Sequence, residues 1–522
     1  LNNRFQLLLN SSLTRLKLDD NRLPSKELLL NNYKEILHYH PHQIISIHSF
    51  GENTTKIIPI IKSDLLLFQS LQSLRLYSIK SNILLSLIDQ LASFPNFYSL
   101  TLDLWIENQN CTNIYQLIFN LPKLKYFKYR IVEMKDIDIV TSLPIATDQQ
   151  KTSIEYFIMD HDCSIKNLFI LLSYTPNVRY LKFLNPVDEN NLNIIEPIKL
   201  IYLTKLSIEI YEMTFDEFEI LIKKFEINLK ILSLDIKDED MSYLNAKRWE
   251  CFLQENLSQL EKFYFKKTVH FSEDYQTPMY LGEQNEFSST FWLERKWIFK
   301  VENDFEHLIY SIQPYKKKWY DYNSKSNQLL KSVAFEIGEK SPERWVKSIS
   351  INDHIYHALT ITQIYHLQIS VAISLENLYK ILVLLPDIET LTLSRLSFTD
   401  PTSISYEERQ SLYLLFHENH FQKISFSGVH QKADIYFLMI ICFHVNHLHV
   451  HCEDYKYAES FVGLILSHVR SKIDNKLRLL SITMPNFAND MIEYLTKIIK
   501  EHKLLNDFII EQVKNDVYIK WT

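Results

Sequence analysis

A cluster of histidines and cysteines near residue 450 contains the side chains best suited to bind a metal. It comprises Cys442, His444, His447, His449, His451 and Cys452. Alternate residues of a strand lie on one side about 6.6 Å apart, so two of these histidines could share a zinc ion with a nearby carboxylate such as Glu453 or Asp454. The segment has no H-E-x-x-H pair and no second set of ligands at a defined spacing. Solvent-exposed histidines without a metal are therefore the favoured interpretation.

Patterns typical of catalysis or cofactor binding do not occur in the sequence. The five glycines are too far apart for a G-x-G-x-x-G or P-loop phosphate cradle, which needs several glycines within a few positions. There is no G-x-S-x-G elbow, no C-x-x-C pair and no recognised protease arrangement of Cys and His. We therefore expect no catalytic residue, no cofactor and no resident metal.

Three tyrosines indicate a different chemistry, the recognition of another protein. Tyr126, Tyr156 and Tyr180 occupy the same position of a repeated pattern, and Lys128 and Lys182 follow two residues later in the first and third copies. Exposed tyrosines beside cations are typical of interface hot spots. The alternative is that tyrosine is simply common, with 30 in the chain, and is tolerated on any sheet face.

The repeated pattern is an h-x-x-h-x-h frame of apolar residues, and its last four positions alternate like a half-buried strand. In the frame that begins at Leu124, a proline stands two residues upstream, where it ends any preceding helix. Prolines occur at the same offset in three other frames. Frames begin at Leu13, His42, Leu71, Phe97, Leu124, Ile154, Val178, Leu203, Leu229 and Leu260, and then at Val346, Ile364, Ile388, Phe421, Val445, Leu477 and Leu505.

Segments between these frames have a helical period, as in Phe215, Phe218, Ile222 and Phe225. Most frames are roughly 24 to 33 residues apart, which overlaps the period of a leucine-rich repeat. The first frame, residues 13–23, matches the full leucine-rich signature, asparagine included. We predict an α/β leucine-rich-repeat solenoid with a parallel concave sheet and convex helices.

The residues between the apolar positions of each strand should face the concave surface. Successive frames place Arg15, Ser73, Ser99, Tyr126, Tyr156, Tyr180, Lys205, Ile231 and Lys262 in one column of that surface. A second column contains Lys17, Arg75, Thr101, Lys128, Ile158, Lys182, Ser207, Ser233 and Tyr264. The predicted partner-binding residues are Tyr126, Tyr156, Tyr180, Lys128, Lys182 and Arg75.

The frames stop between Leu260 and Val346. The interval holds Trp292, Trp297 and Trp319, an alternating run over residues 291–301 and a second extended run over 307–312. These runs predict an inserted β-hairpin or small subdomain, and packing of its own aromatic core is the favoured role. Stacking on single-stranded bases is disfavoured because the net charge is −7, which leaves a protein contact as the other alternative.

The N-terminal residues Arg4, Phe5, Leu8 and Leu9 resemble the closing helix of an F-box, in which a basic and aromatic pair precedes two leucines. With the repeats, the chain resembles the F-box/leucine-rich-repeat family. That resemblance implies a substrate receptor of a cullin-RING ubiquitin ligase that binds an Skp-type adaptor. An amphipathic cap on the first repeat is the alternative. The earlier part of an F-box is missing, and a start at Leu1 indicates a fragment.

Composition places the chain among folded proteins of a reducing compartment. It is 46% hydrophobic and 23% charged, with only five cysteines in 522 residues. No leader or apolar run of spanning length occurs, so we expect a cytoplasmic or nuclear protein that binds neither nucleic acid nor membrane. The expected segments are 1–11, an F-box tail or cap; 12–268, repeats; 269–345, the insertion; and 346–522, further repeats.

Overall fold

The computed structural model describes most of the chain outside its connecting segments. The described residues are 14–18, 41–49, 68–105, 111–131, 142–184, 195–270, 287, 289–304, 307–314, 333–337, 364–385, 388–398, 405–418, 421–429, 432–442, 445–452, 455–471, 476–483, 491–513 and 516–521. By its internal contacts the chain forms two compact units. Unit 1 comprises Leu1–Tyr243 with Arg248–Phe265, and unit 2 comprises Leu244–Lys247 with Lys266–Thr522.

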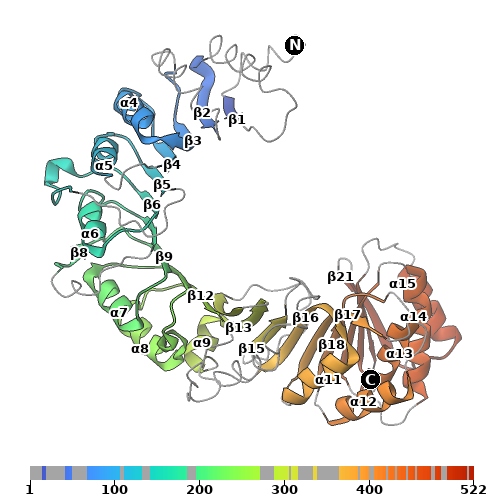
Figure 1. Ribbon diagram of the computed structural model, residues 1–522. Coiled ribbons are helices and arrows are strands. Elements are labelled where there is room, and N and C mark those ends of the chain that lie inside the picture. The colour runs from blue at the N-terminus through green and yellow to red at the C-terminus, as the bar shows by residue number, and fades with distance from the viewer. Residues whose placement is uncertain are drawn as a thin grey trace, which may run out of the picture. The chain divides into compact units, whose positions relative to one another are not determined.

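The sheet of unit 1 is built from strands that follow one another in the sequence and pair in parallel (Figure 1). Its strands are β1 (Thr14–Leu18), β2 (Ile44–Ser49), β3 (Ser73–Lys80), β4 (Ser99–Trp105), β5 (Tyr126–Ile131), β6 (Tyr156–Asp160), β7 (Tyr180–Leu184), β9 (Lys205–Ile210) and β11 (Ile231–Ile236), with β12 (Lys262–His270) beginning in this unit. A separate two-stranded sheet pairs β8 (Ile198–Lys199) with β10 (Phe225–Glu226).

Helices lie on one side of this sheet (Figure 1). They are α4 (Ser81–Leu91), α5 (Thr112–Phe119), α6 (Ile165–Ser173), α7 (Phe215–Lys224) and α8 (Ala246–Asn256), with 3-10 turns η2 (Pro41–Gln43), η4 (Asp148–Gln150) and η5 (Met241–Leu244). From β3 to β12 the apolar positions of the frames point towards these helices and are buried, as in β5, where Phe127 and Tyr129 are fully enclosed. The face on the other side of the sheet, which we call the open face, carries the residues that alternate with them.

Local signals in the sequence account for where several of these helices begin. Thr214 accepts a hydrogen bond from the Glu217 backbone N–H, and the Glu217 side chain accepts one from the Thr214 N–H at 2.8 Å, which makes a capping box for α7. Lys223 and Lys224 occupy its last turn, where cations favour the helix dipole. The side chain of Ser164 caps α6 in a similar way.

Unit 2 contains an antiparallel hairpin followed by a series of parallel strands. β13 (Trp297–Asp304) and β14 (His307–Pro314) form the hairpin, so the predicted β-hairpin is present. Parallel pairings then join β13, β15 (Val333–Ile337), β16 (Ile364–Ser374), β17 (Thr390–Ser397), β18 (Lys423–Phe426), β19 (His447–His451) and β20 (Leu479–Thr483) in that order.

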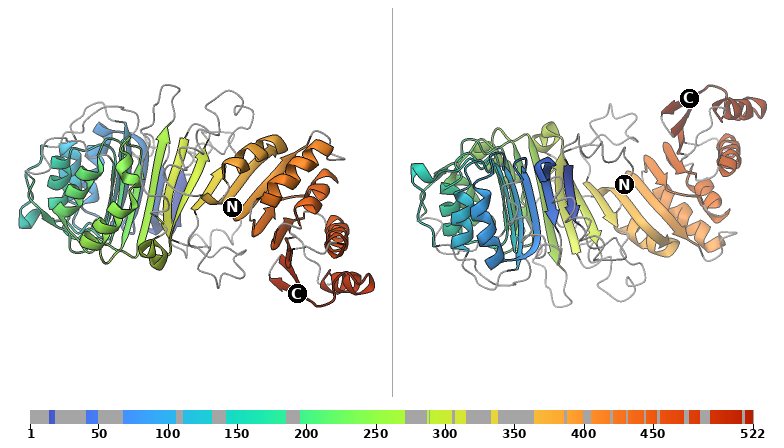
Figure 2. Two further views of the ribbon diagram at one scale, coloured as in Figure 1. Left: turned by 90° about the horizontal axis from the view of Figure 1, so that it is seen from below. Right: turned by 90° about the horizontal axis from the view of Figure 1, so that it is seen from above.

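The helices of unit 2 also lie to one side of its sheet (Figure 2). They are α9 (Thr290–Arg295), α11 (Leu375–Leu384), α12 (Tyr406–Glu418), α13 (Lys432–Ile441), α14 (Tyr455–Arg470) and α15 (Met491–Glu501). Within the described ranges, none of the helices is both long and apolar enough to cross a lipid bilayer.

Two expectations about strands were wrong. The alternating run 291–301 is not one strand, because Thr290–Arg295 forms α9 and the chain turns at Lys296, which has a left-handed φ of 55°. The Arg295 guanidinium lies 3.9 Å above the Phe291 ring, a contact between residues one helical turn apart that a strand would not allow. The run from Leu505 is not a further parallel repeat, because β21 (Phe508–Val513) and β22 (Asp516–Trp521) pair antiparallel.

Adjacent residues of β6 provide a matched test of which face is buried. Phe157 is fully buried among aromatic rings, whereas Tyr156 is 42% exposed. We expect Phe157→Ala to lower the free energy of unfolding by about 3 to 5 kcal/mol through the cavity it leaves. Tyr156→Ala should lower it by no more than about 1 kcal/mol. Urea unfolding followed by circular dichroism measures both, and equal losses would contradict the assignment of faces.

Candidate functional site

Tyr126, Tyr156 and Tyr180, which we call the tyrosine row, lie in register on three successive strands of unit 1. Tyr126 pairs with Tyr156 across β5 and β6, and Tyr156 pairs with Tyr180 across β6 and β7. Their ring centroids are 6.2 Å apart in the first pair and 6.4 Å apart in the second. The predicted alignment of the three side chains on one face is confirmed.

A buried aromatic cluster behind the row holds these strands in place. Phe127 and Phe157, the next residues along β5 and β6, stack with centroids 5.8 Å apart. Tyr115 from α5 meets both of them edge-on at 6.3 and 6.5 Å. Its hydroxyl bonds His161 Nε2 at 2.6 Å. Because close-packed interiors resist displacement, the tyrosine row stands on a rigid support.

The tyrosines themselves are partly exposed. Tyr156 is the most exposed of the three at 42%, and the other two are half-buried. Lys205 Nζ lies 4.3 Å above the Tyr180 ring, a cation–π contact. Partial burial raises the pKa of Tyr180. Its hydroxyl, like any phenol, is protonated at neutral pH and can donate a hydrogen bond.

Asp160 connects the two lysines that flank the row. Lys128 Nζ lies 2.8 Å from one of its carboxylate oxygens, and Lys182 Nζ donates to the other at 2.8 Å. Burial alone would raise the pKa of Asp160, but the two lysine hydrogen bonds outweigh it and the net pKa is lowered. Both lysines are thereby held in defined positions beside the tyrosines.

A second shared carboxylate lies at the edge of the sheet where the strands begin. Glu155 is 3.0 Å from Lys125 Nζ and 3.4 Å from Arg179 Nε, and the three residues directly precede the neighbouring strands β6, β5 and β7. These side chains are largely exposed apart from Glu155, so each pair adds no more than about 1 kcal/mol to stability. These ion pairs hold the three side chains in place beside the tyrosine row.

Arg75 is the predicted site residue that lies apart from the others. It is exposed on β3 and pairs in register with Thr101, which in turn pairs with Lys128. Arg75 and Lys128 are therefore two strands apart on the same column. Arg75 lies on the same open face as the tyrosine row but is not adjacent to the row.

Two residues of this site were not among the predicted ones. Lys205 directly follows Tyr180 in the same column, so the repeat alignment could have included it. No sequence pattern indicates Asp160, because nothing in the sequence shows that one carboxylate would pair with lysines on both neighbouring strands. The four residues expected to resemble an F-box, Arg4, Phe5, Leu8 and Leu9, lie outside the described residues.

The histidines of β19 were expected to be solvent-exposed, and this was wrong. His449 is 7% exposed, and its Nδ1 lies 2.8 Å from Ser481 Oγ on β20. The same hydroxyl lies 2.7 Å from His447 Nε2. His444, Glu453 and Asp454 lie outside the described residues. Among the residues that are described, no three His, Cys, Asp or Glu side chains are grouped to hold a metal ion.

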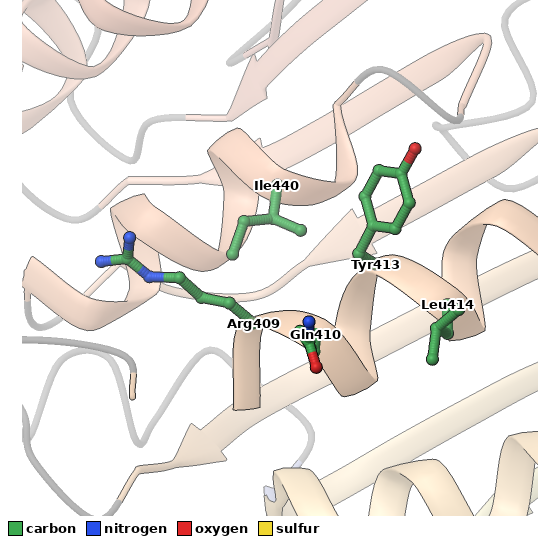
Figure 3. Close-up of a pocket in the computed structure, with 5 residues that line it drawn as sticks. All are labelled: Arg409, Gln410, Tyr413, Leu414 and Ile440. Atoms are coloured by element: carbon green, nitrogen blue, oxygen red, sulfur yellow. The ribbon is translucent and has the colours of Figure 1, made fainter. Parts of the chain in front are cut away.

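A shallow pocket lies on the helical side of unit 2 (Figure 3). It has a volume of about 370 Å³ and is lined by Arg409, Gln410, Tyr413 and Leu414 of α12 and by Ile440 of α13. Arg409 is the one charged side chain in this lining, so the pocket does not bring together the acid, base or nucleophile that a reaction needs.

Comparison with known proteins does not extend this description. No family model matches the chain, and no curated protein matches its sequence.

The buried histidines predict acid sensitivity. Burial, helped by Lys423 and His451, lowers the pKa of His449 from 6.5 to about 3. Between those values the unfolded chain binds a proton that the folded chain excludes, so stability falls as the pH drops below about 6.5. From pH 7 to pH 5 this one group should cost about 2 kcal/mol.

Replacement of His449 by glutamine tests this expectation, since glutamine can still bond Ser481 but does not titrate. The loss of unfolding free energy between pH 7 and pH 5 should be smaller in His449→Gln by about 2 kcal/mol. The same replacement at His502, which is exposed after α15, is the control. An unchanged pH dependence in His449→Gln would contradict the burial of a neutral imidazole.

Proposed function

We propose that this chain is a non-catalytic scaffold that holds another protein on the open face of unit 1. The observation that carries the proposal is the tyrosine row: three partly exposed rings in register, with ordered lysines beside them. Tyrosine supplies a large apolar surface and a hydroxyl while losing little conformational entropy on binding. A few such residues can carry most of the binding energy of an interface.

The ordering of the site supports the same function. Lys128 and Lys182 are already held by Asp160, and the row is backed by the Phe127 and Phe157 rings. Binding would therefore immobilise few additional side chains, each of which otherwise costs about 0.5 to 1.5 kcal/mol. A surface organised before its partner arrives is typical of binding sites on rigid scaffolds.

We further propose that the strand and helix units are leucine-rich repeats that stack as a solenoid, with the open face as its concave side. Support comes from the parallel pairing of successive strands and from the burial of the h-x-x-h-x-h positions. Each unit alone would leave its apolar face exposed, and stacking gives neighbouring units a shared core.

The finer proposal is that the chain is the substrate receptor of a cullin-RING ubiquitin ligase. It rests on the resemblance of Arg4, Phe5, Leu8 and Leu9 to the end of an F-box, together with the repeats. An Skp-type adaptor would then bind at the N-terminal end while the open face holds the substrate. We place this function in the cytoplasm or nucleus, in keeping with five cysteines that are all free thiols.

Removal of the three rings tests protein capture. The variant Tyr126→Ala/Tyr156→Ala/Tyr180→Ala should lose partners recovered by affinity capture and mass spectrometry, with each affected partner reduced about tenfold or more. The control replaces Tyr379, Tyr436 and Tyr494, which lie on helices of unit 2 and are exposed to nearly the same extent as Tyr156. Thermal unfolding should show that both variants are folded. Undiminished capture by the first variant would rule out the row as the site.

The ligase link has a separate test. Immunoprecipitation of the endogenous protein should recover an Skp-type adaptor and a cullin in amounts comparable with the chain itself. Replacement of Leu8 and Leu9 by aspartate should reduce the adaptor while leaving partners of the tyrosine row in place. If neither ligase component is recovered while those partners are, the protein is a scaffold or inhibitor without a ubiquitin-ligase role.

A further inference from the structure

The two central columns of the open face carry a single sign of charge. From β3 to β11, the first column consists of Ser73, Ser99, Tyr126, Tyr156, Tyr180, Lys205 and Ile231. The second consists of Arg75, Thr101, Lys128, Ile158, Lys182, Ser207 and Ser233. Together they hold four cations and no carboxylate, although the whole chain has a net charge of −7.

Carboxylates lie in the columns on either side of this central band. Glu155 stands at the end where the strands begin, and Asp103, Asp160, Glu209 and Asp235 lie towards the other end. The carboxylate of Asp160 is shared by Lys128 and Lys182, which leaves this group of three with a net positive charge. The cationic character of the band is therefore only partly neutralised from its edges.

The lysines also retain hydrogen-bonding capacity. An ammonium group has three N–H donors, and one donor from Lys182 is directed to Asp160. The ammonium of Lys205 lies over the Tyr180 ring, and Arg75 is exposed. The hydroxyl of Tyr180, like any phenol, is protonated at neutral pH and can donate a hydrogen bond. These groups are all suited to meet carboxylate oxygens of a bound partner.

We propose that the partner of the tyrosine row presents an extended acidic polypeptide segment, which lies across the strands along the central band. This inference rests on the proposed function and specifies the chemistry of what is captured. Apolar side chains of the segment pack on the tyrosine rings, and its carboxylates pair with Arg75, Lys128, Lys182 and Lys205.

The spacing of the cations sets the length and pattern of the segment. Neighbouring strands are about 4.8 Å apart, so the five steps from Arg75 on β3 to Lys205 on β9 span about 24 Å. An extended chain covers this distance in about seven or eight residues. Arg75, Lys128 and Lys182 stand on every second strand, roughly 10 Å apart, which matches carboxylates at about every third residue.

The edges of the band favour a polypeptide over a nucleic acid. Single-stranded nucleic acid carries a phosphate charge at every nucleotide, and its affinity depends on broad neutralisation of those charges. Here the cations Arg75, Lys128 and Lys182 stand roughly 10 Å apart. The flanking carboxylates Glu155, Asp103, Asp160 and Glu209 already pair with cations of the protein, so the face cannot neutralise a phosphate at every nucleotide. A narrow peptide with a few carboxylates fits between these edges.

The test begins with selection of a displayed random octapeptide library on the complete chain. The expected result is enrichment of acidic peptides that have carboxylates about three residues apart and an apolar residue between them. A synthetic copy of the most enriched peptide is then labelled, and its dissociation constant is measured by fluorescence anisotropy. Binding should weaken as salt is raised.

Matched charge variants identify the surface. Arg75→Gln/Lys205→Gln should weaken binding of the synthetic peptide about three- to tenfold, as expected for loss of two exposed ion pairs. The control, Lys166→Gln/Lys223→Gln, removes the same charge from exposed positions on α6 and α7 and should leave the affinity unchanged. An equal effect of both variants would overturn the proposal, because general charge would then explain binding.

The remaining outcomes separate this inference from the function it rests on. Enrichment of neutral or basic peptides whose binding still requires the three tyrosines would overturn the proposal of an acidic segment. It would leave the proposed function intact. Tighter binding of an octamer of deoxythymidine than of the peptide would also overturn it, in favour of nucleic acid. If no enriched peptide and no captured protein depends on the tyrosines, the proposed function itself fails.

Discussion

From β4 to β7, and again at β9, β11 and β12, each strand is aligned by a hydrogen-bond arrangement that recurs where the strand begins. The carbonyl of Tyr98 accepts from the N–H groups of Lys125 and Tyr126, both at 2.9 Å. The Lys125 carbonyl accepts in the same way from Glu155 and Tyr156, and the Glu155 carbonyl accepts from Arg179 and Tyr180. One carbonyl therefore sets the register of the following strand, and equivalent residues come to lie side by side. A slip of one residue would exchange the two faces of that strand.

Much of the architecture could be predicted because it depends on local periodicity. The alternation in residues 124–129 marks β5, and the helical spacing of Phe215, Phe218 and Ile222 marks α7. The alignment of Tyr126, Tyr156 and Tyr180 followed from the same frames. These features require only that each residue face the same way as its counterpart in the next unit.

Two of the features that could not be predicted depend on partners far apart in the sequence. Ser481, whose hydroxyl contacts His447 and His449, lies more than thirty residues beyond them, and strand alternation alone indicated exposure. Asp160 likewise gains its role from lysines on two other strands. For residues 291–295, alternation of aromatic residues suits a strand, but contacts such as that of Arg295 with Phe291 favour a short helix. Tertiary packing outweighed local pattern at the histidines and at Asp160, whereas one local pattern outweighed another in residues 291–295.

The carbonyl that accepts from two successive N–H groups where a strand begins affects how the open face can change when whole units are gained or lost. Since each strand is aligned by the one before it, a whole unit can be duplicated or removed while its neighbours keep their own alignment. A duplication of the unit that carries Tyr156 would lengthen the line of rings by one strand spacing. The length of bound chain that the open face contacts can thus change by whole strand spacings. The buried core of the neighbouring units needs no other change.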